Sequence, residues 1–153
     1  MSDFIEVKNL NVLFPVKKEL FKPRRFVRAV HNVNLNIKRG SIVGLAGESG
    51  SGKSTTGKAI LHLIEPTSGE VTIQGYNVFA PGYDVKKLRK ENQIIFQDSF
   101  SSLNPQKTIR QSLEAPMKIH HIGNSKEERE AILGKTLHRV GLSADVLLKY
   151  PHE

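Results

Sequence analysis

Eight consecutive residues of the chain have types and spacing suited to holding phosphate groups. Residues 47–54 read GESGSGKS and match the pattern G-x-x-x-x-G-K-[ST]. Glycines at these positions let the backbone wrap tightly, so that consecutive N–H groups point inward and form a nest for an anion. A helix that begins at the end of the loop adds the positive end of its dipole. The pattern therefore predicts a loop that binds the phosphates of a nucleotide.

The polar residues at the end of this loop have distinct predicted roles. The ammonium of Lys53 should reach the β- and γ-phosphates, and the hydroxyl of Ser54 should bind Mg²⁺. Thr55 follows and is placed to add a hydroxyl or an N–H group beside the α-phosphate. The alternative is a glycine-rich turn that binds nothing, which so specific a pattern disfavours. The predicted nucleotide-binding residues are Gly47, Glu48, Ser49, Gly50, Ser51, Gly52, Lys53, Ser54 and Thr55.

The segments around the loop match what the motif requires. Residues 41–46 are nearly continuously apolar, which predicts a parallel strand covered on both faces directly before the loop. Residues 55–64 place apolar side chains on one side of a helix that ends in a Pro-Thr-Ser-Gly turn. The apolar patterns predict further strands at residues 4–13, 27–37, 71–73 and 93–97, and a short helix at residues 86–90. This part of the chain is therefore typical of an α/β fold.

After Pro105 the spacing of the apolar residues becomes helical. Ile109, Leu113 and Met117 are spaced by four residues, as on one face of a helix. Because proline lacks the N–H group of a helix interior, Pro116 should bend this helix or end it.

A second helix is predicted from its end signals. Residues 124–125 offer an N-cap, and Glu128 lies three residues after Ser125, as in a capping box. Gly141 is a plausible C-cap, and residues 143–150 read as one more short helix. The apolar stripe between the two caps is made by Ile132, Leu133, Leu137 and Val140.

The composition is that of an ordinary globular chain with a basic surface. The 153 residues carry a formal net charge of +8 and no cysteine, which excludes a disulfide framework and thiolate metal sites. No apolar run approaches the ~18 residues of a membrane span, and the first residues lack the pattern of a signal peptide. Much of the positive charge lies in residues 17–28, which we interpret as a solvated loop, with a phosphate-binding or membrane-surface role as the alternative. No aromatic-rich pattern accompanies this charge, so nucleic acid is not an expected partner.

Three stretches together resemble one family. The sequences VGLAGESGSGKST, IIFQDSFSSLNP and YPHE resemble the ATPase subunits of ABC transporters, and among these the type that imports oligopeptides and dipeptides. The resemblance covers nearly the whole chain. It implies a P-loop NTPase fold of the ABC ATPase kind, with residues 1–104 as the nucleotide-binding α/β core and residues 105–153 as part of the helical subdomain. It also implies that the nucleotide is ATP, bound with Mg²⁺.

The resemblance assigns two further site residues. Gln97 matches the Q-loop glutamine, which in the family contacts Mg²⁺ or the attacking water and couples the site to the membrane subunits. Phe14, at the end of the first predicted strand, matches the aromatic residue that stacks on adenine. Phe26 is its rival for this role. A surface glutamine and a core phenylalanine are the alternatives.

Some family motifs do not occur in these 153 residues. The signature segment that follows YPHE in the family, the Walker B aspartate with its adjacent catalytic glutamate, and the switch histidine are all missing. We therefore expect the sequence to be the amino-terminal portion of such a subunit, truncated just before the signature. Alone it should bind ATP without hydrolysing it. The alternative function is a nucleotide-binding regulatory module.

The resemblance also implies partners and a location. A second ATPase subunit would pair head to tail with this one, two transmembrane permease subunits would be driven, and a substrate-binding protein would act indirectly. The location implied is the cytoplasmic face of the membrane. Because the expected strand at residues 41–46 would lack parallel neighbours, we expect the isolated chain to be marginally stable and prone to association.

Overall fold

The computed structural model describes residues 3–16, 24–98 and 102–153, and the part of the basic segment at residues 17–23 lies outside them. The chain divides into two compact units, Met1–Asn92 and Gln93–Glu153, which we call unit 1 and unit 2. The boundary between functional subdomains expected after residue 104 stays a prediction. In the part of the chain that the structure describes, no helix is both long enough and apolar enough to cross a membrane.

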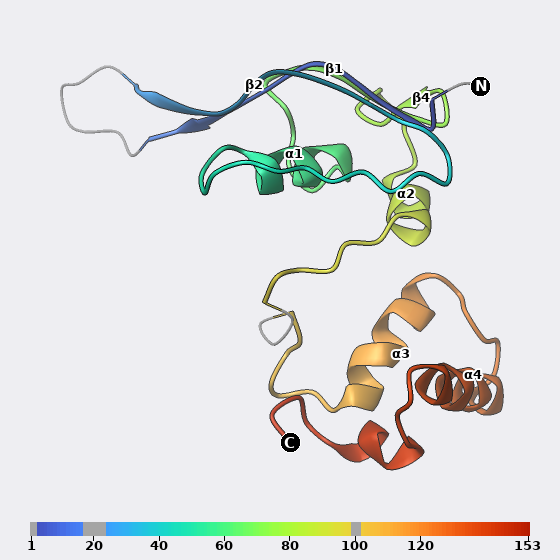
Figure 1. Cartoon of the computed structure of the whole chain (residues 1–153). Coiled ribbons are helices and arrows are strands. Elements are labelled where there is room, and N and C mark those ends of the chain that lie inside the picture. The colour runs from blue at the N-terminus through green and yellow to red at the C-terminus, as the bar shows by residue number, and fades with distance from the viewer. Residues whose placement is uncertain (1–2, 17–23, 99–101) are drawn as a thin grey trace. The chain divides into compact units, whose positions relative to one another are not determined.

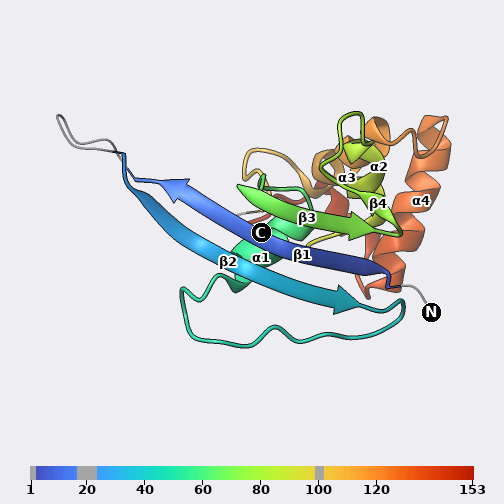
Figure 2. The same cartoon turned by 90° about the horizontal axis from the view of Figure 1, so that it is seen from above.

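Unit 1 is built on a four-stranded antiparallel sheet (Figures 1 and 2). Its strands are β1 (Ile5–Pro15), β2 (Phe26–Ile37), β3 (Ser68–Ile73) and β4 (Tyr76–Asn77), in the spatial order β2-β1-β3-β4. The strands expected at residues 4–13, 27–37 and 71–73 are confirmed. The two-residue β4 is too short to leave a periodic pattern in the sequence.

A bulge lets β1 keep its apolar side chains on one face of the sheet. Val7 and Leu10 are both buried although they are three positions apart, which strict alternation forbids. The pairing register of β1 shifts between these two residues, and Asn9 adopts a φ of 49° there. Asparagine tolerates this left-handed conformation better than most residues, so the irregularity falls where asparagine stands.

Two helices complete unit 1. Helix α1 (Lys53–Ile60) lies under one face of the sheet, and α2 (Val85–Glu91) follows β4 (Figure 1). The short helix expected at residues 86–90 is confirmed, whereas the one expected at residues 55–64 begins at Lys53 and ends at Ile60. Its early end follows from His62, whose φ of 52° cannot continue a right-handed helix. The buried core between helices and sheet consists of Val7, Leu10, Val12, Val30, Ala59, Ile60, Val71, Ile73, Val78 and Leu88.

Two of the expected strands are wrong. Residues 41–46 and 93–97 are irregular, and the side chains of Ile42 and Ile95 are 102% and 93% exposed. An apolar run predicts burial, but a strand also needs a neighbour to satisfy its N–H and C=O groups. In the described residues the sheet contains only β1 to β4, so neither segment has a strand to pair with.

The described residues of unit 2 form two α-helices and a short 3₁₀-helix. They are α3 (Ile109–Ile119), α4 (Lys126–Arg139) and η1 (Ala144–Leu148), packed around Met117, Leu133, Leu137 and Leu147. Pro116 was expected to bend the first helix or end it; it does not end it, since α3 continues to Ile119, and the bend stays a prediction. The carbonyl of Pro116 still accepts from His120 N–H at 3.0 Å, so only the donor of the proline itself is lost.

Both ends of α4 use the signals expected from the sequence. The Ser125 hydroxyl accepts from Glu128 N–H at 3.0 Å, and the Glu128 carboxylate accepts from Asn124 N–H at 2.7 Å. At the other end Gly141 has a φ of 76°, and the N–H of Leu142 donates to the carbonyl of Leu137, as in a Schellman motif. The bounds of α4 therefore follow from local chemistry.

The N-cap of α4 gives a first testable prediction. Replacing Ser125 with alanine removes the acceptor for the Glu128 N–H and should lower the free energy of unfolding by about 1 kcal/mol. Equilibrium unfolding in urea measures this change. The control is Ser125→Asp, which keeps an acceptor at the cap and should cost little. A loss of similar size in both variants would contradict the capping role.

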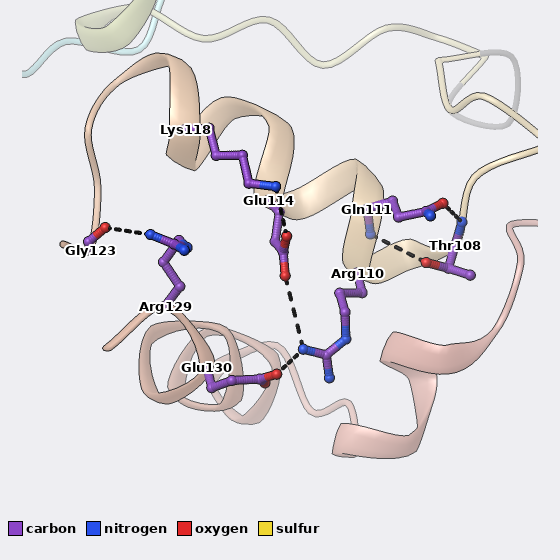
Figure 3. Close-up of polar contacts among 8 residues, drawn as sticks. All are labelled: Thr108, Arg110, Gln111, Glu114, Lys118, Gly123, Arg129 and Glu130. Atoms are coloured by element: carbon purple, nitrogen blue, oxygen red, sulfur yellow. Dashed lines mark hydrogen bonds and ion pairs between the residues drawn. The ribbon is translucent and has the colours of Figure 1, made fainter. Parts of the chain in front are cut away.

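Helix α3 is tied into unit 2 by a second cap and by ion pairs (Figure 3). Thr108 and Gln111 form a capping box, in which Thr108 N–H donates to Gln111 Oε1 at 3.0 Å. The Thr-x-x-Gln pattern of this capping box is present in the sequence, but the cap was not predicted from it. Arg110 pairs with Glu130 of α4, and Glu114 accepts from Lys118 at 3.2 Å. The Arg110–Glu130 pair links α3 to α4, whereas the Glu114–Lys118 pair lies within α3.

Candidate functional site: the phosphate-binding loop

The predicted phosphate-binding loop leads directly into the first turn of α1. Gly50 and Gly52 have φ values of 81° and 92°, in the left-handed region that glycine adopts without strain. Gly52 is the N-cap of α1, and no side chain caps this helix. The N–H groups of the first turn thus have no side-chain cap and can take an anion. Helix α1 begins at Lys53, as the motif requires of a helix at the end of the loop.

A close approach to β2 fixes where the loop ends. A Cβ atom on Gly52 would lie 2.2 Å from the carbonyl oxygen of Ala29. Only glycine fits there without a shift of the backbone. Thr56 reinforces this position, since its N–H and hydroxyl both donate to the carbonyl of Gly52, at 2.8 and 3.0 Å. No pattern in the sequence signals the role of Ala29, because this contact joins residues far apart in the chain.

The Lys53 ammonium lies inside the loop. Its Nζ donates to the carbonyls of Gly47 and Glu48 at 2.8 and 2.6 Å and to the hydroxyl of Ser51 at 3.3 Å. These oxygens surround the ammonium much as phosphate oxygens would. The loop differs in one respect from the expected nest of inward N–H groups. The N–H of Ser51 donates to the Glu48 carbonyl at 3.2 Å. A bound phosphate would therefore compete with oxygens of the loop for Lys53.

Ser54 and Thr55 occupy the first turn of α1. The Ser54 side chain is exposed, and its hydroxyl makes no hydrogen bond with any described residue. It is therefore available as an oxygen ligand of Mg²⁺, an ion that takes few ligands from the protein and the rest from water and phosphates. The described residues contain no cluster of three or more His, Asp or Glu side chains that could hold a metal. Thr55 is half-buried.

The register of the β1–β2 ribbon separates the two candidates for adenine stacking. Phe14 pairs with Val27, and Phe26 pairs with Pro15, so the two phenylalanines lie on opposite faces. Phe14 lies two residues after the buried Val12, and the pairing register of β1 shifts between Val12 and Leu13. Both rings are accessible, with exposed fractions of 43% for Phe14 and 53% for Phe26.

Both candidates lie at the same end of the ribbon. Val27, the partner of Phe14, lies two residues before Ala29, the residue against which Gly52 rests, and Phe26 lies three residues before it. Two residues of a strand span about 7 Å. This end of the ribbon is therefore near the end of the phosphate-binding loop, and the choice of Phe14 over Phe26 stays a prediction.

Gln97 belongs to unit 2, whereas the loop belongs to unit 1. Gln97 is exposed in an irregular segment, which leaves its amide accessible to a ligand. Its meeting with Ser54 at one metal ion stays a prediction. A hollow of about 450 Å³ lined by Phe4, Arg39 and Gln74 contains no residue of the loop, so we do not assign nucleotide to it.

Comparisons with known proteins show what this chain is similar to. The family model for ABC transporters matches residues 30–152, which include the whole loop. The chain is 36% identical to the oligopeptide transport ATP-binding protein AppF of Bacillus subtilis and 37% identical to the dipeptide transport ATP-binding protein DppF of Escherichia coli. Each comparison covers 97% of this chain but only 46% and 44% of the relative, so the chain spans just under half the length of these relatives.

A solved structure shows the same fold. The ATP-binding cassette MJ0796, in a dimeric post-hydrolysis state bound to ADP and phosphate, is 30% identical with a TM-score of 0.74. The comparison covers 97% of this chain and 62% of the cassette. The fold is thus the α/β fold of an ABC ATPase, as its amino-terminal portion. With the family model matching most of its length, this chain belongs to the ABC transporter family.

Proposed function

We propose that this chain is the ATP-binding part of an ATPase subunit that energises the import of oligopeptides or dipeptides. One observation carries the proposal: Lys53, at the first turn of α1, lies within 2.8 Å of two oxygens of a loop whose end rests against β2. This places a cation and the N-terminus of a helix at one point. The names of the similar proteins supply the transported class.

The residues present fit ATP and Mg²⁺. Lys53 would bind the β- and γ-phosphates in place of the loop carbonyls, and the N–H groups at the start of α1 would bind phosphate oxygens. Ser54 and Gln97 would be the oxygen ligands of Mg²⁺ from this chain, and Phe14 would stack on adenine. When bound, Mg²⁺ would neutralise charge on the β- and γ-phosphate oxygens.

The proposed partners are those that the resemblance to peptide-importing ATPase subunits implies. A second ATPase subunit would pair with this one head to tail, two transmembrane permease subunits would receive the energy, and a substrate-binding protein would act through them. The proposed location is the cytoplasmic face of the membrane, as a peripheral subunit. Tested alone, the 153-residue chain should bind ATP without turnover, because no residue in it matches the catalytic glutamate of the family.

Peptide uptake by the native cell tests the proposed function. In a strain that carries Lys53→Ala, uptake of a labelled dipeptide or of a labelled longer peptide should be lost. Lys58→Ala, which removes one positive charge from the last turn of the same helix, should leave uptake intact. Unchanged peptide uptake in the Lys53 variant, or loss of some other solute instead, would show that the function is different.

The assignment of Phe14 gives a second testable prediction. Phe14→Ala should weaken ATP binding by about 1–3 kcal/mol, since it removes the stacking surface for the base. It should leave the binding of inorganic triphosphate unchanged, because that ligand has no base. Calorimetric titration measures both affinities. Phe26→Ala is the matched control, and a larger loss of ATP affinity in that variant would reverse the assignment.

A further inference from the structure

A second hollow of unit 1 lies away from the phosphate-binding loop. It has a volume of about 210 Å³ and opens between the β3–β4 turn and α2. Two of the chain's three tyrosines line it, together with charged and polar residues of α2 and its ends. The residues that carry the argument are Tyr76, Tyr83, Asp84, Lys87, Glu91 and Asn92.

Alternating charges face this hollow from α2. Asp84, Lys87 and Glu91 are spaced by three and four residues, which places them on one face of the helix. Asp84 is used as the N-cap, where its carboxylate accepts from Lys87 N–H at 3.0 Å. Among the described residues, neither the Lys87 ammonium nor the Glu91 carboxylate has an ion-pair partner. One cation and one carboxylate thus remain available at the hollow.

The position of Glu91 is unfavourable for the helix itself. Glu91 is the last residue of α2, where the free backbone carbonyls already give a negative potential. The next residue, Asn92, donates through both its N–H and its side-chain amide to the Leu88 carbonyl, at 2.9 and 3.1 Å. This leaves the side-chain oxygen of Asn92 as an acceptor. The end of α2 therefore offers a cluster of acceptors suited to a cation.

The tyrosine rings add an aromatic surface. Tyr76 is 70% exposed, whereas Tyr83 is half-buried. Burial raises the pKa of the Tyr83 hydroxyl, and the negative charges of Glu91 and Asp84 raise it further. The negative charges of Glu91 and Asp84 are therefore felt at the Tyr83 hydroxyl. The faces of tyrosine rings attract cations.

We propose that this hollow binds a small zwitterion of the size of one amino acid, with its cationic group at Glu91, Asn92 and the tyrosine rings and its carboxylate at Lys87. A ligand with both charges satisfies both unpaired side chains at once. The volume is below the range of about 300–1,000 Å³ typical of pockets for drug-sized ligands, which suits so small a molecule. The proposal does not depend on ATP binding, and its test contains no nucleotide.

Tyrosine fluorescence tests the proposal, because the chain has no tryptophan. The background variant is Tyr150→Phe, because Tyr150 lies in unit 2. The two tyrosines that remain are those of the hollow. L-arginine should produce a saturable change, and agmatine, which lacks the carboxylate, should bind more weakly. Glu91→Gln should weaken arginine binding about tenfold or more, as expected for a lost charged hydrogen bond. Lys87→Gln should remove the preference for arginine over agmatine.

The matched control is Glu70→Gln, an exposed carboxylate of β3 outside this hollow. It should leave arginine binding unchanged. The absence of a saturable change with either probe, or an equal loss in the Glu70 and Glu91 variants, would overturn the site. A preference for arginine that survives Lys87→Gln would overturn the zwitterionic assignment. Since Glu91 is exposed, its variant should keep the circular dichroism of the parent chain.

Discussion

Replacing Gly52 with alanine is expected to destabilise unit 1 by about 2–5 kcal/mol. A φ of 92° costs a residue with a Cβ atom about 1–2 kcal/mol, and forcing an atom into a packed contact costs about 1–3 kcal/mol more. The contact is with backbone, since the new atom would lie 2.2 Å from the Ala29 carbonyl oxygen. Either β2 or the start of α1 must move. Equilibrium unfolding in urea measures the loss, and ATP affinity should fall with it.

Two neighbouring glycines separate the causes of this loss. Gly50 has a φ of 81°, but a Cβ atom there would meet nothing within 4 Å, so Gly50→Ala should cost only about 1–2 kcal/mol. Gly57 lies inside α1 without a positive φ and also faces open space, so Gly57→Ala should stabilise the helix by about 1 kcal/mol. If Gly52→Ala costs no more than Gly50→Ala, the contact with Ala29 does not position the loop.

Replacing Lys53 with alanine is expected to weaken ATP binding about 10- to 150-fold, which corresponds to about 1.5–3 kcal/mol. The ammonium is the group that the loop surrounds with oxygens, and no other cation of the chain is found in that position among the described residues. Calorimetric titration with ATP·Mg²⁺ measures the change. The free energy of unfolding should change little, because the Gly47 and Glu48 carbonyls are exposed to water.

The control for Lys53 must remove a charge without touching the loop. Lys58→Ala does so from the last turn of the same helix and should change ATP affinity by less than twofold or so at moderate salt, because surface charges are screened. Equal losses in the two variants would mean that Lys53 acts only through the net charge of the chain. Lys53 would then have no specific role at the phosphates.

The features that sequence alone could predict are those set by local chemistry. The bounds of α4 follow from Ser125, through its side chain, and from Gly141, through its backbone freedom. Both effects act within one turn of the helix. The phosphate-binding loop follows from its glycines in the same way. By contrast, the contact between Gly52 and Ala29 joins two segments distant in sequence, so no pattern signals it.

The two missed strands show a different limit. Residues 41–46 and 93–97 are apolar enough for strands, but a strand depends on a hydrogen-bonded neighbour that its own sequence does not encode. The face assignment of Phe14 also needed the structure, because it depends on which residue of β2 pairs with it. Pairing register is a property of two segments, and the bulge at Asn9 makes simple alternation misleading.

The central claim is that residues 47–55 bind the phosphates of ATP, and the amide chemical shifts of the loop test it most directly. In a titration with ATP·Mg²⁺ followed by two-dimensional nuclear magnetic resonance, the largest shifts should fall on the N–H groups of this loop and the first turn of α1. Inorganic triphosphate should shift the same groups, and adenosine should not. Loop amides that remain unchanged while ATP binds elsewhere would contradict the account.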